Sequence, residues 1–152
     1  MKPSKMNHVG LIVRDLEFAE AFLREVFGLE PAALEPNPSV RARFYQAGDV
    51  TIQLVEDELR LRGAPIARLD HICMDVDDID EVMHAGERFS AQFVWDEPLV
   101  HAGSYRAQFI KDSGGLGVVL QLQDARGTPQ GRQHTPNDQR ILSEAMAEGR
   151  PQ

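Results

Sequence analysis

The chain has 152 residues, 42% of them hydrophobic, and a formal net charge of −8 at pH 7. This length suits one domain with a single core, and a negative charge without a basic stripe argues against nucleic acid as a partner. No apolar run reaches the roughly 20 residues of a membrane helix and the first residues show no signal-peptide pattern, so we expect no membrane partner and a cytoplasmic location. The single cysteine, Cys73, cannot form a disulfide within the chain, which agrees with a reducing compartment.

The first half of the chain predicts a strand, a helix and a hairpin, with an irregular segment before the hairpin. Residues 7–13 form an apolar strand, and Asp15 can cap a helix that ends at Gly28. Residues 29–38 are rich in proline and leave room for one short strand. Residues 40–55 then predict two strands joined by a tight turn.

The second half predicts the same order of elements. Residues 70–76 form a strand, and Asp78, with an acidic residue three positions later, is typical of a capping box before a helix. The remaining strands are expected at residues 91–95, 106–110 and 117–123, with a loop at residues 97–105.

We therefore predict one domain over residues 1–124, built from two modules at about residues 6–58 and 69–124. Residues 125–152 form a polar tail in which only residues 140–148 predict a short helix. We expect this tail to be peripheral, or to pack on a partner subunit through one apolar stripe made of Ile141, Leu142 and Met146.

The two modules share a repeated motif. Each opens with a polar residue, a histidine and a short apolar strand, at Asn7-His8 and at Asp70-His71, and each later has an apolar strand with a central glutamine, Gln53 or Gln121. A buried glutamine needs a partner, which is either a neighbouring backbone group or a bound ligand. The duplication therefore predicts a pseudo-symmetric site with four inward side chains.

Two carboxylates close to the glutamines are alternative ligands. Glu56 and Asp124 each lie three residues after a glutamine. In a regular strand an odd offset places a side chain on the opposite face, so we expect both carboxylates to point away from the site.

These motifs resemble the vicinal oxygen chelate superfamily over residues 6–124. The second half most resembles the methylmalonyl-CoA epimerases, through His71-Ile72-Cys73, the acidic segment at residues 75–80 and Asp96-Glu97-Pro98. The resemblance implies an α+β fold in which two βαβββ modules form an open, curved, mixed sheet around a central cavity. It also implies a homodimer.

The resemblance places the metal ligands of the superfamily at His8, Gln53, His71 and Gln121. The implied cofactor is a divalent metal ion, with Zn, Co, Mn, Ni and Mg all open. The epimerases generally keep a glutamate among these positions, whereas both non-histidine positions here are glutamine. Neutral ligands leave the charge of the ion uncompensated, which weakens binding and makes the ion a stronger Lewis acid.

A catalytic base must then come from outside these four positions. The candidates are His101, Tyr45 and Tyr105, whereas His84 and His134 are typical of surface residues. Cys73 is typical of a buried packing residue and not of a nucleophile.

The favoured function is a metal-dependent epimerase or isomerase that abstracts a proton next to a carbonyl of a small-molecule substrate, either a methylmalonyl-CoA-like thioester or a keto-sugar or cyclitol. The alternative is a protein that binds and sequesters a drug or metabolite without chemistry, as antibiotic-resistance members of the superfamily do. Glyoxalase-type lyase activity is a third option. Extradiol dioxygenation is disfavoured, because its iron site needs a carboxylate ligand.

Overall fold

The computed structural model describes residues 4–33, 40–101 and 104–148. The first module consists of β1 (Lys5–Val13), α1 (Leu16–Phe27), β2 (Glu30–Pro31), β3 (Arg41–Ala47) and β4 (Val50–Glu56). The second consists of β5 (Ala67–Asp75), α2 (Ile79–Gly86), β6 (Leu99–His101), β7 (Tyr105–Ile110) and β8 (Val119–Asp124), with short 3-10 turns at Glu87–Phe89 and Asp112–Gly114. Helix α3 (Pro136–Ala147) follows.

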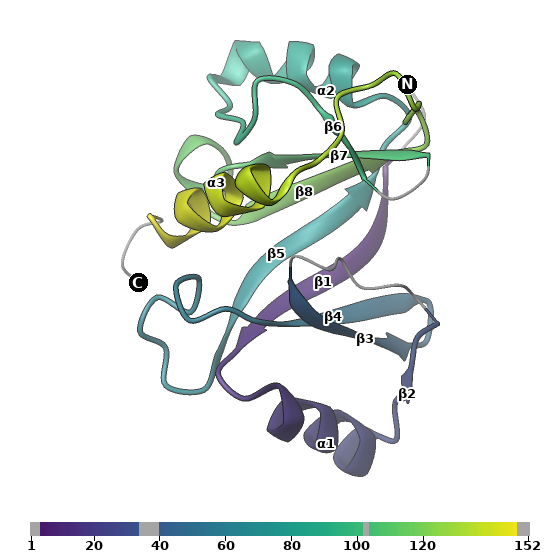
Figure 1. Ribbon diagram of the computed structural model, residues 1–152, viewed down its shortest axis with the longest axis vertical. Coiled ribbons are helices and arrows are strands. Elements are labelled where there is room, and N and C mark those ends of the chain that lie inside the picture. Colours follow the sequence, from purple (N-terminus) through teal and green to yellow (C-terminus); the bar gives the residue numbers. More distant parts are fainter. Residues whose placement is uncertain (1–3, 34–39, 102–103, 149–152) are drawn as a thin grey trace.

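The eight strands of the described residues form one mixed sheet in the order β2-β3-β4-β1-β5-β8-β7-β6. Each module places its first strand parallel to its last, β1 beside β4 and β5 beside β8, and the modules join where β1 and β5 run antiparallel. The sheet is open, because β2 and β6 end it without pairing to each other. The prediction of two βαβββ modules in an open mixed sheet is confirmed (Figure 1).

The caps of the module helices follow the sequence signals. Asp15 accepts a hydrogen bond from the backbone N–H of Phe18 at 3.0 Å, and α1 ends at Gly28, whose φ of 66° is left-handed. Asp78 caps α2 by accepting from Asp80, in place of the capping box with Glu81 that the sequence indicates.

One strand lies elsewhere than predicted. The second strand of the second module is β6, inside the segment expected to be a loop, whereas in residues 91–95 only Phe93 forms an isolated bridge. The side chain of Gln108 accepts from the backbone N–H of Trp95 at 3.2 Å and donates to its carbonyl at 2.9 Å. These contacts satisfy the backbone groups of Trp95 that a strand ladder would use.

The expectation of a peripheral C-terminal tail is wrong. Leu142 and Met146 of α3 are buried in a core cluster with Trp95, Leu99, Phe109 and Val119, all from the second module, and Ile141 packs against this cluster. Arg62 of the linker donates to the backbone carbonyl of Met146, and Ser143 donates to Asp57 at 3.1 Å. The apolar stripe of α3 is thus covered within its own chain.

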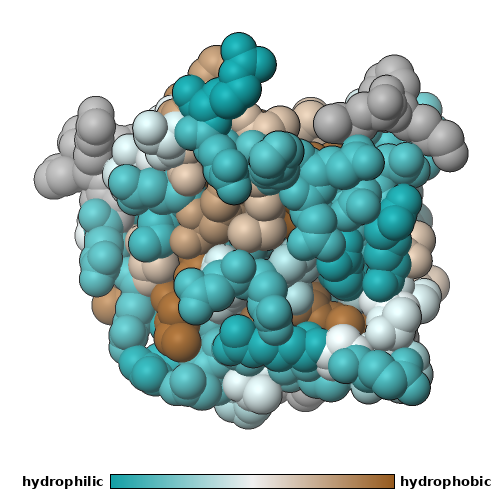
Figure 2. Space-filling view, turned by 90° about the horizontal axis from the view of Figure 1, so that it is seen from above, coloured by the Kyte–Doolittle hydropathy of each residue, from teal (hydrophilic) through white to brown (hydrophobic). Residues whose placement is uncertain are grey.

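One face of the molecule is mainly hydrophilic (Figure 2). The face seen from above in Figure 2 carries mainly hydrophilic residues, with hydrophobic residues gathered near its middle. Within the described residues, no helix combines the length and the apolar character needed to cross a membrane.

Candidate metal and active site

The structure brings the repeated motif together on the four central strands. His8 of β1 and His71 of β5 are buried, and their Nε2 atoms lie 3.0 Å apart. The rings of Phe44 and Phe109 contact His8 and His71 respectively, edge to face. The two halves of the chain thus meet at one pair of histidines.

The two glutamines lie at the same place. Burial and, to a smaller extent, the electrostatic effect of His71 lower the pKa of His8 to about 3, although the nearby amides of Gln121 and Gln53 oppose this lowering. His8 is therefore neutral at physiological pH. Gln121 is buried, and the Oε1 atom of Gln53 is buried without a hydrogen-bond partner in the part of the chain that the structure describes.

Two irregularities in the β1–β5 pairing orient the histidines. Met6 and His8 of β1 pair with two consecutive residues of β5, so Asn7 between them has no partner in the register. Leu69 and His71 of β5 pair with two consecutive residues of β1, so Asp70 between them has none either. Asn7 and Asp70 are therefore the extra residues of two bulges, which re-aim side chains. Asn7 Oδ1 lies 2.8 Å from His8 Nδ1, and Asp70 Oδ2 lies 2.7 Å from His71 Nδ1.

These partners assign the hydrogen-bonding role of each ring nitrogen. Asn7 donates its Nδ2 to Asp75 at 3.1 Å, so its Oδ1 faces His8 as an acceptor. Both Nδ1 atoms therefore donate, and both Nε2 atoms turn a lone pair into the site. Two lone pairs 3.0 Å apart repel each other unless a cation, either a proton or a metal ion, lies between them.

The donor set fits a divalent ion. No group of three or more His, Cys, Asp or Glu side chains that could hold a metal occurs among the described residues. A metal at this place therefore needs the amide oxygens of Gln53 and Gln121 beside the two imidazoles. The unpartnered Oε1 of Gln53 is an oxygen available for that purpose.

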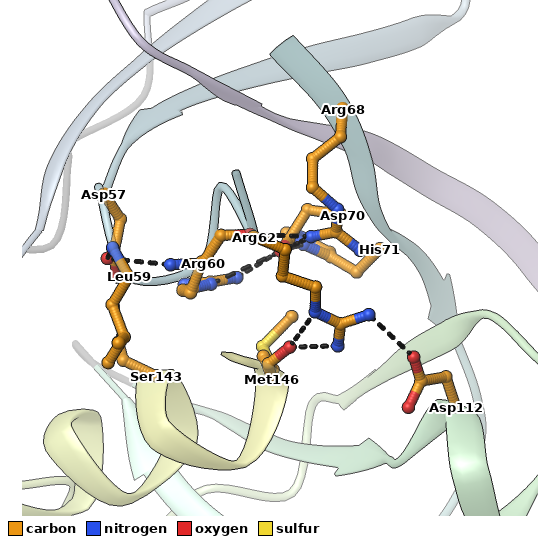
Figure 3. A network of polar contacts seen from close by, with 10 residues as sticks. All are labelled: Asp57, Leu59, Arg60, Arg62, Arg68, Asp70, His71, Asp112, Ser143 and Met146. Carbon is orange, nitrogen blue, oxygen red and sulfur yellow. Dashed lines mark hydrogen bonds and ion pairs between the residues drawn. The ribbon is translucent and has the colours of Figure 1, made fainter. Parts of the chain in front are cut away.

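A buried ionic network lies behind His71 (Figure 3). Asp70 is almost fully buried and accepts hydrogen bonds from Arg60 at both oxygens and from Arg68 at 3.3 Å. Burial by itself would raise the pKa of Asp70, but the charge of Arg60 and the hydrogen bond from His71 outweigh it and hold the pKa at about 2. His71 thus has an ionised carboxylate behind it, whereas His8 has a neutral amide.

The ring of His71 lies directly over Gly10 of β1. A Cβ atom at Gly10 would come within 2.1 Å of Cε1 of His71. Only glycine leaves space for this ring at the junction of the two modules.

The alternative carboxylates point away, as the odd offset predicts. Glu56 accepts from the backbone N–H of Leu16 at 2.9 Å, and Asp124 accepts from that of Ile79 at 2.8 Å. Each therefore satisfies the N-terminus of the helix in its own module, on the other face of the sheet.

The three candidate bases do not share one place. Tyr45 is wrong as a site residue, because it packs against Leu16 of α1 and donates to Glu20 at 2.9 Å. Its neighbour Phe44 contacts His8 and so points into the site. His101 and Tyr105 stack on each other with ring centroids 5.5 Å apart. Tyr105 lies four residues before Phe109 on β7, so both side chains share the face that contacts His71.

His134 is not a free surface residue. Its ring centroid lies 4.2 Å from that of His101, and its Nε2 atom is buried. Burial and the charge of His134 lower the pKa of His101 to about 4, and burial raises the pKa of Tyr105. His84 is exposed as expected, and burial raises the pKa of Cys73, which agrees with a packing role.

The residues that orient the histidines are not among the site residues that the sequence predicts. They are Asn7, Asp70 and Arg60. The available signal was the polar side chain before each histidine in both halves of the repeat.

Comparisons with known proteins identify the family of the chain. Residues 5–120 match the family model of the Glyoxalase/Bleomycin resistance protein/Dioxygenase superfamily. The chain is 28% identical over 134 residues to the mitochondrial methylmalonyl-CoA epimerase of Homo sapiens, covering 80% of this chain and 74% of that protein. It is 29% identical over 134 residues to the ethylmalonyl-CoA/methylmalonyl-CoA epimerase of Cereibacter sphaeroides, covering 78% of this chain and 96% of the relative.

A solved structure shows the same fold. The methylmalonyl-CoA epimerase of Mycobacterium tuberculosis superposes with a TM-score of 0.66 at 20% identity, covering 78% of this chain and 86% of that chain. The part of the chain that matches the family model ends before α3, so α3 lies outside the matched region.

Proposed function

Because the chain belongs to the Glyoxalase/Bleomycin resistance protein/Dioxygenase superfamily, we propose that it is an epimerase that exchanges the proton next to the carbonyl of a methylmalonyl-CoA-like thioester. The observation that carries the proposal is the convergence of two histidine Nε2 atoms, 3.0 Å apart, beside a buried and unpartnered glutamine oxygen. Relatives that carry epimerase names support the reaction class.

His8, Gln53, His71 and Gln121 would hold one divalent metal ion. When bound, the ion supplies Lewis-acid stabilisation of negative charge that develops on the substrate carbonyl oxygen. The residues themselves exclude water, because both histidines and Gln121 are buried. We expect the metal to be retained weakly, since none of the four side chains is anionic.

His101 and Tyr105 are the groups that we assign to proton movement. With a pKa of about 4, His101 is a neutral imidazole at physiological pH and can accept a proton. The raised pKa of Tyr105 keeps its hydroxyl protonated, so it can donate a hydrogen bond or a proton. Their rings stack on each other where β6 pairs with β7, and Tyr105 shares a face of β7 with Phe109.

Proton exchange in D₂O tests this function. The purified protein is incubated with 2-substituted malonyl thioesters, 2-hydroxy ketones and keto-cyclitols, with and without divalent metal, and deuterium uptake is read by NMR. We expect metal-dependent uptake at the carbon next to the carbonyl of the thioesters. Tight binding without exchange on the whole panel would contradict the epimerase and support a sequestering protein.

The homodimer and the cytoplasmic location stay predictions. Because α3 buries Leu142 and Met146 within its own chain, a dimer must use another surface than the one expected from the sequence. Light scattering at micromolar concentration measures the oligomeric state, and a monomeric mass would contradict the dimer.

A further inference from the structure

We propose that Asp70 is a positioning residue that makes His71 the stronger of the two histidine ligands, and that Asn7 holds His8 as the weaker one. This inference rests on the proposed metal site. With four neutral ligands, the negative charge that helps to retain a divalent ion has to come from the groups behind the ligands. Partners of that kind raise the basicity of a ligating imidazole and fix its orientation.

The two histidines have matched geometry but different partners. Their Nδ1 atoms lie 2.8 Å from Asn7 Oδ1 and 2.7 Å from Asp70 Oδ2, and each partner is the extra residue of a bulge. Distance and backbone position are therefore nearly equal. The partner of His71 carries a full charge, and the partner of His8 carries none.

Burial makes this charge effective. Asp70 is 1% exposed, so water screens its interaction with His71 very little. In the first module the carboxylate of Asp75 contacts Asn7 and not the ring of His8, so the side chain of Asn7 separates that charge from the histidine.

The arginines fix the direction of the carboxylate. Oδ1 of Asp70 accepts from Arg60 Nε at 3.4 Å and from Arg68 Nη1 at 3.3 Å, and Oδ2 accepts from both Arg60 and His71. With both oxygens engaged, Asp70 cannot rotate away from His71. A purely structural role, in which Asp70 only neutralises Arg60, would make metal affinity insensitive to the charge behind the histidine.

Two charge-conserving double variants separate these roles. Asp70→Asn with Arg60→Gln removes the carboxylate behind His71 together with its main arginine partner, while Arg68 keeps its hydrogen bond to the backbone carbonyl of residue 60. Asn7→Asp with Asp75→Asn moves a carboxylate directly behind His8 and keeps a hydrogen bond between positions 7 and 75. Arg14→Gln with Glu58→Gln removes an exposed ion pair of 3.1 Å and serves as the control.

Co²⁺ is titrated into each metal-free protein at constant pH and followed by its visible absorption, with thermal unfolding as a check on folding. We expect roughly 10- to 100-fold weaker binding after the change at Asp70, tighter binding after the change at Asn7, and no change in the control. Binding by the wild type with the two test variants within twofold of it would overturn this inference and leave the metal site standing. Failure of the wild type to bind Co²⁺ would overturn the metal site and this inference together.

Discussion

The two modules follow one backbone plan but distribute charge differently. In both, a bulge residue holds the histidine, and a carboxylate three residues after the glutamine caps the module helix. In the second module these supporting carboxylates, Asp70 and Asp124, are buried and paired with arginines. In the first module the corresponding residues are the neutral Asn7 and the partly exposed Glu56, which pairs with Arg41.

This difference shows which features the duplication requires. The bulge, the inward histidine and the helix cap recur because they are set by backbone geometry. The buried charges do not recur, because buried ion pairs are costly and each module compensates them with its own neighbours. The first module is therefore expected to tolerate changes in its supporting residues better than the second.

The largest effect should come from removing either histidine. We expect His8→Ala and His71→Ala each to lower the rate of deuterium exchange on the thioester by roughly 100-fold or more, because the lost charge stabilisation is several kcal/mol. NMR of the exchange reaction measures this, with the exposed His84→Ala as the control. If either variant kept wild-type exchange, the two modules would not form one site.

The next largest effect concerns the two helix-capping carboxylates. We expect Asp124→Ala to lower the free energy of unfolding by about 3 kcal/mol, because it leaves the buried Ile79 N–H without its acceptor and removes the most buried of the three carboxylates that pair with Arg106. The equivalent Glu56→Ala should cost about 1 kcal/mol, since its ion pair with Arg41 is partly exposed. Urea unfolding measures both, and equal losses would contradict the proposed difference between the modules.

A smaller effect should distinguish the residues two positions after each histidine. Gly10→Ala places a methyl group against the ring of His71, so we expect a loss of about 2 kcal/mol and weaker Co²⁺ binding. Cys73→Ala, at the matching position of the second module, should cost about 1 kcal/mol and leave Co²⁺ binding unchanged. Similar metal affinities in the two variants would show that the ring of His71 can move without consequence.

The smallest effect is the acid sensitivity that His101 of the second module adds to that of His8. Burial lowers the pKa of His101 to about 4, so its contribution to stability is complete above the unfolded value near 6.5 and is lost as pH falls toward 4. We expect His101→Gln to reduce the loss of stability over this interval by about 1 kcal/mol. Urea unfolding at several pH values measures the free energy of unfolding of both proteins. If its dependence on pH were the same in the wild type and the variant, the acid sensitivity would come from other groups.

Much of the fold was predictable because its signals are local. Apolar strands, the cap at Asp15, the stop at Gly28 and the repeated histidine and glutamine all depend on neighbouring residues. The periodicity of strands also predicted that Glu56 and Asp124 would point away from the site.

What the tertiary structure decided depends on contacts between distant segments. β6 forms by pairing with β7, while Gln108 occupies the backbone groups of Trp95. The position of α3 depends on the apolar cluster that Leu142 and Met146 form with residues of the second module. Tyr45 and Phe44 are adjacent aromatic residues, and only the sheet register shows which of them faces His8. The bulges at Asn7 and Asp70 arise from the pairing of β1 with β5, which are more than fifty residues apart, so the orientation of both histidines depended on that pairing.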